Sequence, residues 1–187
     1  LILGDQLDEN ASALNGFEPQ QDAIWMAEVA EESTHVTSAK QRTTVFLSAM
    51  RHFALALREK SWTVDYTAIN ASDNAGTLAG ELDKAIVRLQ PDKLIMTAPG
   101  DWRVLQSLRQ IAIKHGLLLD LRDDRHFFST VREFATHAAD RKQIRLEFFY
   151  RELRVKTGIL MNGKKPVGDQ WNFDAENRGS FGKNGPG

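Results

Sequence analysis

The sequence predicts an α/β fold in which a five-stranded parallel sheet carries helices on both of its faces. Short apolar runs alternate along the chain with segments whose apolar residues recur at the roughly 3.6-residue period of a helix. This alternation, with short connections, is typical of parallel strands joined by crossover helices. Because right-handed crossovers leave few topologies, we predict a doubly wound, Rossmann-like sheet with the strand order 3-2-1-4-5.

Five short runs are predicted to form the strands of this sheet. The first run opens the chain, and the third alternates between apolar and polar residues, as a half-buried strand does. The five runs comprise residues 1–3, 23–27, 63–69, 93–97 and 117–121.

Three segments between the strands have helical periodicity. The first covers residues 44–57, and its apolar stripe consists of Phe46, Ala49, Met50, Phe53 and Leu57. The second covers residues 78–89, after a turn rich in Asn, Ser and Asp at 70–74 that predicts the helix start. The third ends before Gly116 and is predicted to face the core with Trp102, Leu105, Leu108 and Ile111.

A C-terminal helical extension and a linker are predicted to follow the sheet. Residues 129–138 predict a short helix and residues 143–156 a longer one that stops at Gly158. In the longer helix, acid-first pairs four residues apart are expected to stabilise it, namely Glu147 with Arg151 and Glu152 with Lys156. We therefore divide the chain into an α/β domain, residues 1–140, and a helix plus linker, residues 141–187.

Composition and charge limit the classes of function that this chain can have. The 187 residues are 42% hydrophobic and 26% charged, which is ordinary for a soluble globular protein, and no apolar run is long enough to span a membrane. The absence of Cys excludes disulfides and thiolate-bound metal or iron–sulfur clusters within this stretch. We expect a cytoplasmic protein.

The basic residues concentrate near the C-terminus. Residues 1–140 hold 14 Lys/Arg and 20 Asp/Glu, whereas residues 141–187 hold 10 and 5. This indicates either a solvated basic surface or a face toward a polyanion or an acidic partner. Lys164 and Lys165 could meet phosphates there, although solvation or pairing with another domain explains them more simply.

A ligand is expected outside the carboxyl ends of the parallel strands. The loops there are residues 4–7, 28–32 and 99–102. Plainer structural roles stay open, because Asp101 suits a helix N-cap and Trp102 suits core packing. The acidic residues Glu28, Glu31 and Glu32 favour a neutral or donor-rich heterocycle over an anion.

The motifs of common active sites are absent from the sequence. There is no G-x-G-x-x-G after the first strand, no phosphate-binding G-x-x-x-x-G-K-[ST] and no G-x-S-x-G elbow. The five His residues are scattered, none with metal-ligand spacing, and His35 near the second loop receives no assigned role. We predict no catalytic residue and no metal site in this chain.

Four segments carry a resemblance to a known family. They are LILGDQL at residues 1–7, SAMRHFALALRE at 48–59, PGDWRV at 99–104, and LEFFYRELRVKTGILMNGKKPVGDQWNFDAENR at 146–178. Together they resemble the N-terminal domain of the deoxyribodipyrimidine photolyase-related family, in its branch of iron–sulfur bacterial cryptochromes and (6-4) photolyases.

The resemblance implies that this domain is a light-harvesting antenna that binds 6,7-dimethyl-8-ribityllumazine. FAD and a 4Fe-4S cluster would lie in a larger, helical C-terminal domain that this chain lacks, and the residues after 140 would lead to it. Trp171 and Phe173 would then pack along the domain junction. Without that domain, we expect exposed apolar surface and a dimer of the chain in a crystal or in solution.

The resemblance also implies a set of chromophore-binding residues. A carboxylate such as Glu32 would accept from ribityl hydroxyls, backbone amides at residues 4–6 would donate to ring oxygens, and Leu7 or Met50 would pack on the ring. The complete set is Gly4, Asp5, Gln6, Leu7, Glu28, Glu32, Met50, Pro99, Gly100, Asp101 and Trp102.

The leading interpretation is therefore an antenna domain of a flavoprotein that repairs UV-damaged DNA with light, a DNA photolyase and thus a carbon–carbon lyase. Its partners would be its own C-terminal photolyase domain and, for the whole protein, UV-damaged DNA, with no membrane. The alternatives are a sensory cryptochrome-type photoreceptor, a stand-alone nucleotide-binding α/β module, and a structural domain with an empty pocket.

Overall fold

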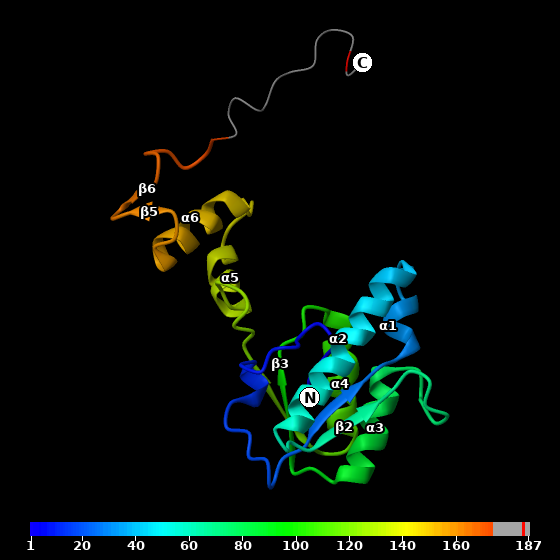
Figure 1. Cartoon of the computed structure of the whole chain (residues 1–187). Coiled ribbons are helices and arrows are strands. Elements are labelled where there is room, and N and C mark those ends of the chain that lie inside the picture. The colour runs from blue at the N-terminus through cyan, green and yellow to red at the C-terminus, as the bar shows by residue number, and fades with distance from the viewer. Residues whose placement is uncertain (174–184, 186–187) are drawn as a thin grey trace. The chain divides into compact units, whose positions relative to one another are not determined.

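The computed structural model describes residues 1–173 and residue 185 (Figure 1). The chain divides into two compact units, Leu1–Arg125 and His126–Gly187, and each is considered by itself. The predicted boundary after residue 140 falls between the two helices of the second unit. The end of the predicted linker, residues 174–184 and 186–187, lies outside the described residues.

The first unit alternates strands and helices, which confirms the α/β class. A short 3-10 helix, η1 (Ser12–Leu14), precedes four strands and four helices. These are β1 (Ile24–Ala27), α1 (Ala30–Thr34), α2 (Lys40–Glu59), β2 (Val64–Thr67), α3 (Leu78–Leu89), β3 (Lys93–Thr97), α4 (Trp102–Lys114) and β4 (Leu118–Arg122). No helix in the described part of the chain is long and apolar enough to cross a membrane.

The strands form two parallel pairs. β1 pairs with β2 from Ile24 opposite Val64, and β3 pairs with β4 from Lys93 opposite Leu118. The predicted continuous sheet of five strands is not confirmed, because residues 1–3 lack the repeated ladder that defines a strand. They form single bonds on two sides, from the Ile2 amide to the Trp25 carbonyl at 3.0 Å and from the Leu1 amino group to the Ile95 carbonyl at 2.7 Å.

Two apolar clusters form the core of this unit. Successive residues of a strand point to opposite faces, so Trp25 and Ala27 belong to one cluster and Ile24 and Met26 to the other. The first cluster packs against α3 and α4, and the second against α2. β1 is therefore buried on both faces, with helices on each side.

The apolar stripe of α4 differs from the predicted one at its start. Its buried residues are Val104, Leu105, Leu108 and Ala112. Trp102, predicted to face the core, is 70% exposed because the first position of the helix turns it outward. Asp101 is the N-cap, as its carboxylate accepts from the Arg103 amide at 2.8 Å.

The helix α3 covers the predicted residues 78–89, but its capping residue differs from the predicted one. Its N-cap is Thr77, whose hydroxyl oxygen accepts from the Gly80 amide at 3.0 Å, rather than a residue of the turn at 70–74. The segment 70–74 belongs instead to the loop before the helix. The buried Glu81 stabilises this loop, because its carboxylate accepts a hydrogen bond from the Ala75 amide at 2.5 Å.

Thr77→Ala is expected to lower the free energy of unfolding by about 1 kcal/mol, because the cap bond to Gly80 is lost. Urea unfolding followed by circular dichroism measures the difference. Thr44→Ala is the control, since the Thr44 hydroxyl only bonds back to Lys40 on the exposed side of α2. Equal midpoints for the two variants would contradict the capping role.

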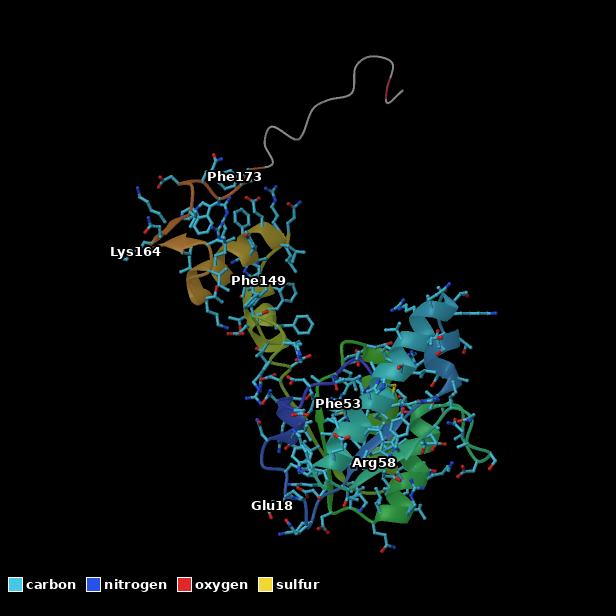
Figure 2. All side chains as sticks on the ribbon, in the orientation of Figure 1. Glu18, Phe53, Arg58, Phe149, Lys164 and Phe173 are labelled. Atoms are coloured by element: carbon cyan, nitrogen blue, oxygen red, sulfur yellow. The ribbon has the colours of Figure 1, made fainter. Side chains whose placement is uncertain are left out.

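The second unit contains two helices and a small hairpin. α5 (Val131–Ala138) starts in a capping box formed by Thr130 and Glu133, and α6 (Leu146–Thr157) ends at Gly158 in the left-handed conformation. The hairpin pairs β5 (Met161–Asn162) with β6 (Lys165–Pro166), and Lys164 lies at its exposed turn (Figure 2). The predicted helices at both positions are confirmed.

The charge pairs of α6 match the prediction only in part. Glu147 and Arg151 form the expected pair at 2.5 Å. The pairing of Glu152 with Lys156 is wrong, because residues of α5 and its C-terminal end compete for both side chains. Glu152 contacts His137 at 2.9 Å, and Lys156 contacts Glu133 at 2.5 Å.

The predicted junction aromatics are engaged within the second unit. The guanidinium groups of Arg151 and Arg154 lie 5.5 and 5.3 Å from the centre of the Trp171 ring. The Phe173 ring lies against Gly168, where an added Cβ would come within 2.8 Å of the ring. Their role toward another domain stays a prediction.

Candidate functional site

A cavity of about 330 Å³ lies at the carboxyl ends of β1 and β3, within the first unit. Segments that are distant in the sequence meet there, namely residues 3–5, residues 27–29 at the end of β1, and residues 99–104 around the start of α4. These are the strand ends at which the topology rule predicts a ligand. The volume is at the lower end of the range for small-molecule sites.

One wall of the cavity is apolar. Phe46, Leu47 and Met50 come from α2, and Leu78 and Val104 come from the starts of α3 and α4. The spacing of Phe46 and Met50 places them one helical turn apart on the same face. A flat ring system could pack against this wall.

The rest of the lining is mainly polar and comes largely from α1, the turn after it and the first turn of α2. Sequence reasoning assigned no site role to most of these residues, because the segment has no motif and little apolar periodicity. They are Ser33, His35, Val36, Ser38, Arg42 and Thr43. The apolar stripe that contains Phe46 and Met50 was the sequence signal that α2 lines a cavity as well as packing against the core.

The structure brings most of the predicted site residues to the cavity. Those that line it are Gly4, Asp5, Glu28, Glu32, Met50, Pro99 and Asp101. Four predicted residues do not line it, namely Gln6, Leu7, Gly100 and Trp102.

The four that lie elsewhere serve the fold or face solvent. Gln6 is buried, and its side-chain amide donates to the carbonyls of Thr97 at 3.3 Å and Ala98 at 3.1 Å. Leu7 packs against the α2 side of the core. Gly100 and Trp102 are exposed.

The loop after residue 7 packs against the ends of β3 and β4. Thr97 at the end of β3 accepts from the Ala13 amide at 3.1 Å and bonds the Ser12 hydroxyl at 3.0 Å. Arg122 at the end of β4 donates to the Ser12 and Asn15 carbonyls, both at 2.8 Å. The loop therefore covers the end of β4 and the Thr97 side chain, while residues 99–104 after β3 line the cavity.

Gly4 allows α2 to approach the N-terminal segment closely. A Cβ at this position would lie 2.5 Å from Phe46 Cε1 and 2.7 Å from Met50 Sδ, far inside van der Waals contact. The glycine is thus required for packing rather than only for a tight turn. It lets both side chains line the cavity.

Glu28 is a buried structural centre at the floor of the cavity. Its carboxylate accepts from Arg51 Nε at 2.6 Å, Arg51 Nη2 at 2.8 Å, the Tyr66 hydroxyl at 2.5 Å and the Ile69 amide at 2.8 Å. Burial alone would raise the pKa of Glu28, but the bonds from Arg51, Tyr66 and Ile69 outweigh it and lower the pKa. Four donors occupy the carboxylate, which leaves it little capacity for a ligand.

Arg103 gathers the other acidic groups. Its guanidinium contacts Glu32 at 2.8 Å, Asp101 at 3.2 Å and Glu31 at 3.5 Å. Each of the acidic residues Glu28, Glu31 and Glu32 is thus paired with an arginine, so their charge alone is a weaker argument for a neutral or donor-rich ligand, which stays a prediction.

Asp5 is the carboxylate of the cavity that forms no ion pair within the described part of the chain. Its pKa is raised, first because the surrounding protein removes hydration from the carboxylate, and then because Glu32, Asp124 and Asp101 lie near it. A ligand that donates hydrogen bonds would relieve this unfavourable charge.

The chemical character of the cavity follows from its lining residues. Over residues 1–173 and 185, no group of three or more His, Cys, Asp or Glu side chains is placed to hold a metal ion. The cavity combines an apolar wall with carboxylates, hydroxyls and two arginines. Fold and site together define an α/β module with a cavity at the carboxyl ends of its strands.

Comparison with known proteins gives the family. A family model described as deoxyribodipyrimidine photo-lyase-related protein matches residues 1–186. The chain is 48% identical over 178 residues to a protein named (6-4) photolyase from Agrobacterium fabrum, a match that covers 95% of this chain and 35% of that protein. The chain belongs to the deoxyribodipyrimidine photolyase-related family, and it spans about a third of the length of this relative.

Proposed function

We propose that this chain is the light-harvesting, chromophore-binding part of a photolyase-related protein that acts in light-driven repair of UV-damaged DNA. Family membership and the similarity to a (6-4) photolyase support a role of this class. The observation that carries the antenna role is the cavity at the ends of β1 and β3. A site with no catalytic constellation suits a group that only absorbs light.

The lining of the cavity supports 6,7-dimethyl-8-ribityllumazine as the proposed chromophore. The flat ring system would pack on the apolar wall around Phe46 and Met50. The hydroxyls of the ribityl chain would donate to the carboxylates of Asp5 and Glu32, and Arg42 and Thr43 would donate to acceptors of the ligand. When bound, the lumazine would absorb light and pass the excitation to the flavin of the whole protein.

The remaining parts of the whole protein are part of the same proposal. FAD, a 4Fe-4S cluster and the DNA lesion site would belong to a C-terminal photolyase domain. A sensory photoreceptor of the cryptochrome type would use the same antenna. Repair assays on the whole protein, with UV-damaged DNA as substrate, separate the two.

We also infer that residues 1–3 act as the central strand in the order 3-2-1-4-5. The bonds of Ile2 to β1 and of Leu1 to β3 support this order. It would place the two parallel pairs in one sheet and the cavity at its switch point.

The proposal is tested by titrating the chain with the lumazine, followed by ligand absorption and fluorescence, with ATP as the control ligand. Saturable lumazine binding is expected. Phe46→Ala should weaken it about fivefold to tenfold, because an aromatic contact with the ring is lost. Val45→Ala is the matched control, since Val45 is exposed on the same helix and does not line the cavity.

Other outcomes would count against the proposal. Binding of ATP without binding of the lumazine would indicate the nucleotide-binding module instead. If neither ligand binds, the chain does not act as the antenna by itself. Equal affinities of Phe46→Ala and Val45→Ala would place the lumazine outside this cavity.

A further inference from the structure

Residues 30–38, which comprise α1 and the turn after it and are called the α1 wall below, contain no buried residue. From Ala30 to Ala49 no residue is buried, and α1 has no side-chain cap. Val36, which lines the cavity, is largely exposed to solvent. Segments with few buried apolar contacts open locally at low free-energy cost.

Few contacts hold this wall to the rest of the first unit. The Glu31 amide donates to the Gly76 carbonyl at 3.0 Å. Arg103 contacts Glu32 at 2.8 Å and Glu31 at 3.5 Å. Arg103 and Glu32 both line the cavity, one from α4 and the other from α1, and both side chains are about one-third exposed. Their ion pair therefore connects the two sides of the cavity where it meets solvent.

The α4 side of this connection is firm. Val104 and Leu105, the residues after Arg103, are buried in the core. Asp101 caps the helix at the Arg103 amide and also contacts its guanidinium at 3.2 Å. The guanidinium thus projects from a rigid helix start toward a wall that is weakly anchored.

We propose that Arg103 is a latch that holds the α1 wall against the cavity, and that a ligand enters when residues 30–38 swing away from it. The latch itself follows from the ligand-free geometry. Its effect on chromophore entry rests on the proposed function. An exposed ion pair is weak enough to open frequently, so the latch sets rates more than it sets affinity.

The first test uses hydrogen–deuterium exchange of the ligand-free chain. Arg103→Gln is expected to speed exchange of amides in residues 30–38 about threefold to fivefold, with little change in α3 and α4. Arg103→Lys should restore part of the protection, because the charge remains. Raised salt should speed exchange of this segment in the unmodified chain and not in Arg103→Gln.

Arg109→Gln is the matched control, because Arg109 lies on the same helix and forms no ion pair within the described residues. It should leave exchange of residues 30–38 unchanged. If Arg103→Gln behaves like Arg109→Gln, the latch is overturned, whether or not the lumazine binds.

The second test measures entry by stopped-flow mixing with the lumazine. Arg103→Gln should raise the association and dissociation rate constants together by about threefold, while the dissociation constant changes less than twofold. A change confined to the dissociation constant would show that Arg103 contacts the ligand instead of gating it. Failure of the unmodified chain to bind would refute the proposed function and leave the exchange test of the latch standing.

Discussion

Glu28→Ala is expected to lower the free energy of unfolding by about 3 kcal/mol. Glu28 is 1% exposed, and its carboxylate accepts from Arg51, Tyr66 and the Ile69 amide. Its removal leaves the tyrosine hydroxyl and the amide without their acceptor, and it opens space beneath the cavity. Because Arg51 is half-exposed, its guanidinium can regain water, so the loss stays below that of a fully buried ion pair.

The same group makes stability depend on pH. The folded pKa of Glu28 lies below its unfolded value, so the folded state binds this proton less readily than the unfolded state. Its contribution is fully present above the unfolded pKa and is lost as the pH falls through the folded pKa. The unmodified chain should therefore lose stability on acidification below about pH 4.5, and Glu28→Gln should lose less over that range.

Urea unfolding at pH 7 and at pH 3.5 measures both effects. Glu18→Gln is the control, because Glu18 is exposed and its carboxylate accepts from the side-chain amide of the nearby Gln21 at 2.7 Å. Equal losses for Glu28→Ala and Glu18→Gln would show that the hydrogen-bond network does not stabilise the fold. A loss of lumazine binding in Glu28→Gln without a loss of stability would instead favour direct contact with the ligand.

The parts of the fold set by local signals could be predicted from the sequence. The helical stripes of α2 and α3 and the cap at Asp101 depend on residues within one or two turns of each other. The edge of the sheet that holds the cavity follows from the alternation of strands and helices. Those signals are enough to predict that Gly4, Pro99 and Asp101 lie close together, as they do in the cavity.

Ion pairs between residues that are distant along the chain could not be predicted from the sequence. Glu28 and Glu32 read as similar acidic residues, yet the first is buried beside Arg51 and the second is partly exposed beside Arg103. Lys156 meets Glu133 on another helix rather than a neighbour on its own. Such choices depend on tertiary distances, and no local periodicity encodes them.

The continuous sheet is a different case. Residues 1–3 have the apolar character of a strand, and they contact β1 and β3 through Ile2 and Leu1. Two single bonds do not form a ladder, so the predicted order stays a proposal.

Gly4→Val is expected to weaken lumazine binding by at least about tenfold while the chain stays folded. A Cβ at Gly4 would lie 2.5 and 2.6 Å from ring atoms of Phe46 and 2.7 Å from the sulfur of Met50. Both are the ends of flexible side chains, so they can rotate away at a cost of about 1–3 kcal/mol. Since both line the cavity, their displacement disturbs the wall on which the ring would pack.

Gly100→Val separates the effect of this contact from the effect of losing a glycine near the same edge. No atom lies within 4 Å of a Cβ built at Gly100, and its backbone is not in the left-handed region, so binding and stability should both be retained. Titration with the lumazine, together with urea unfolding, compares the two variants. If Gly4→Val binds as tightly as Gly100→Val, the ring does not pack on the Phe46–Met50 wall. The chromophore site would then have to be sought away from this cavity, because a side chain at position 4 has to displace Phe46 and Met50 from its wall.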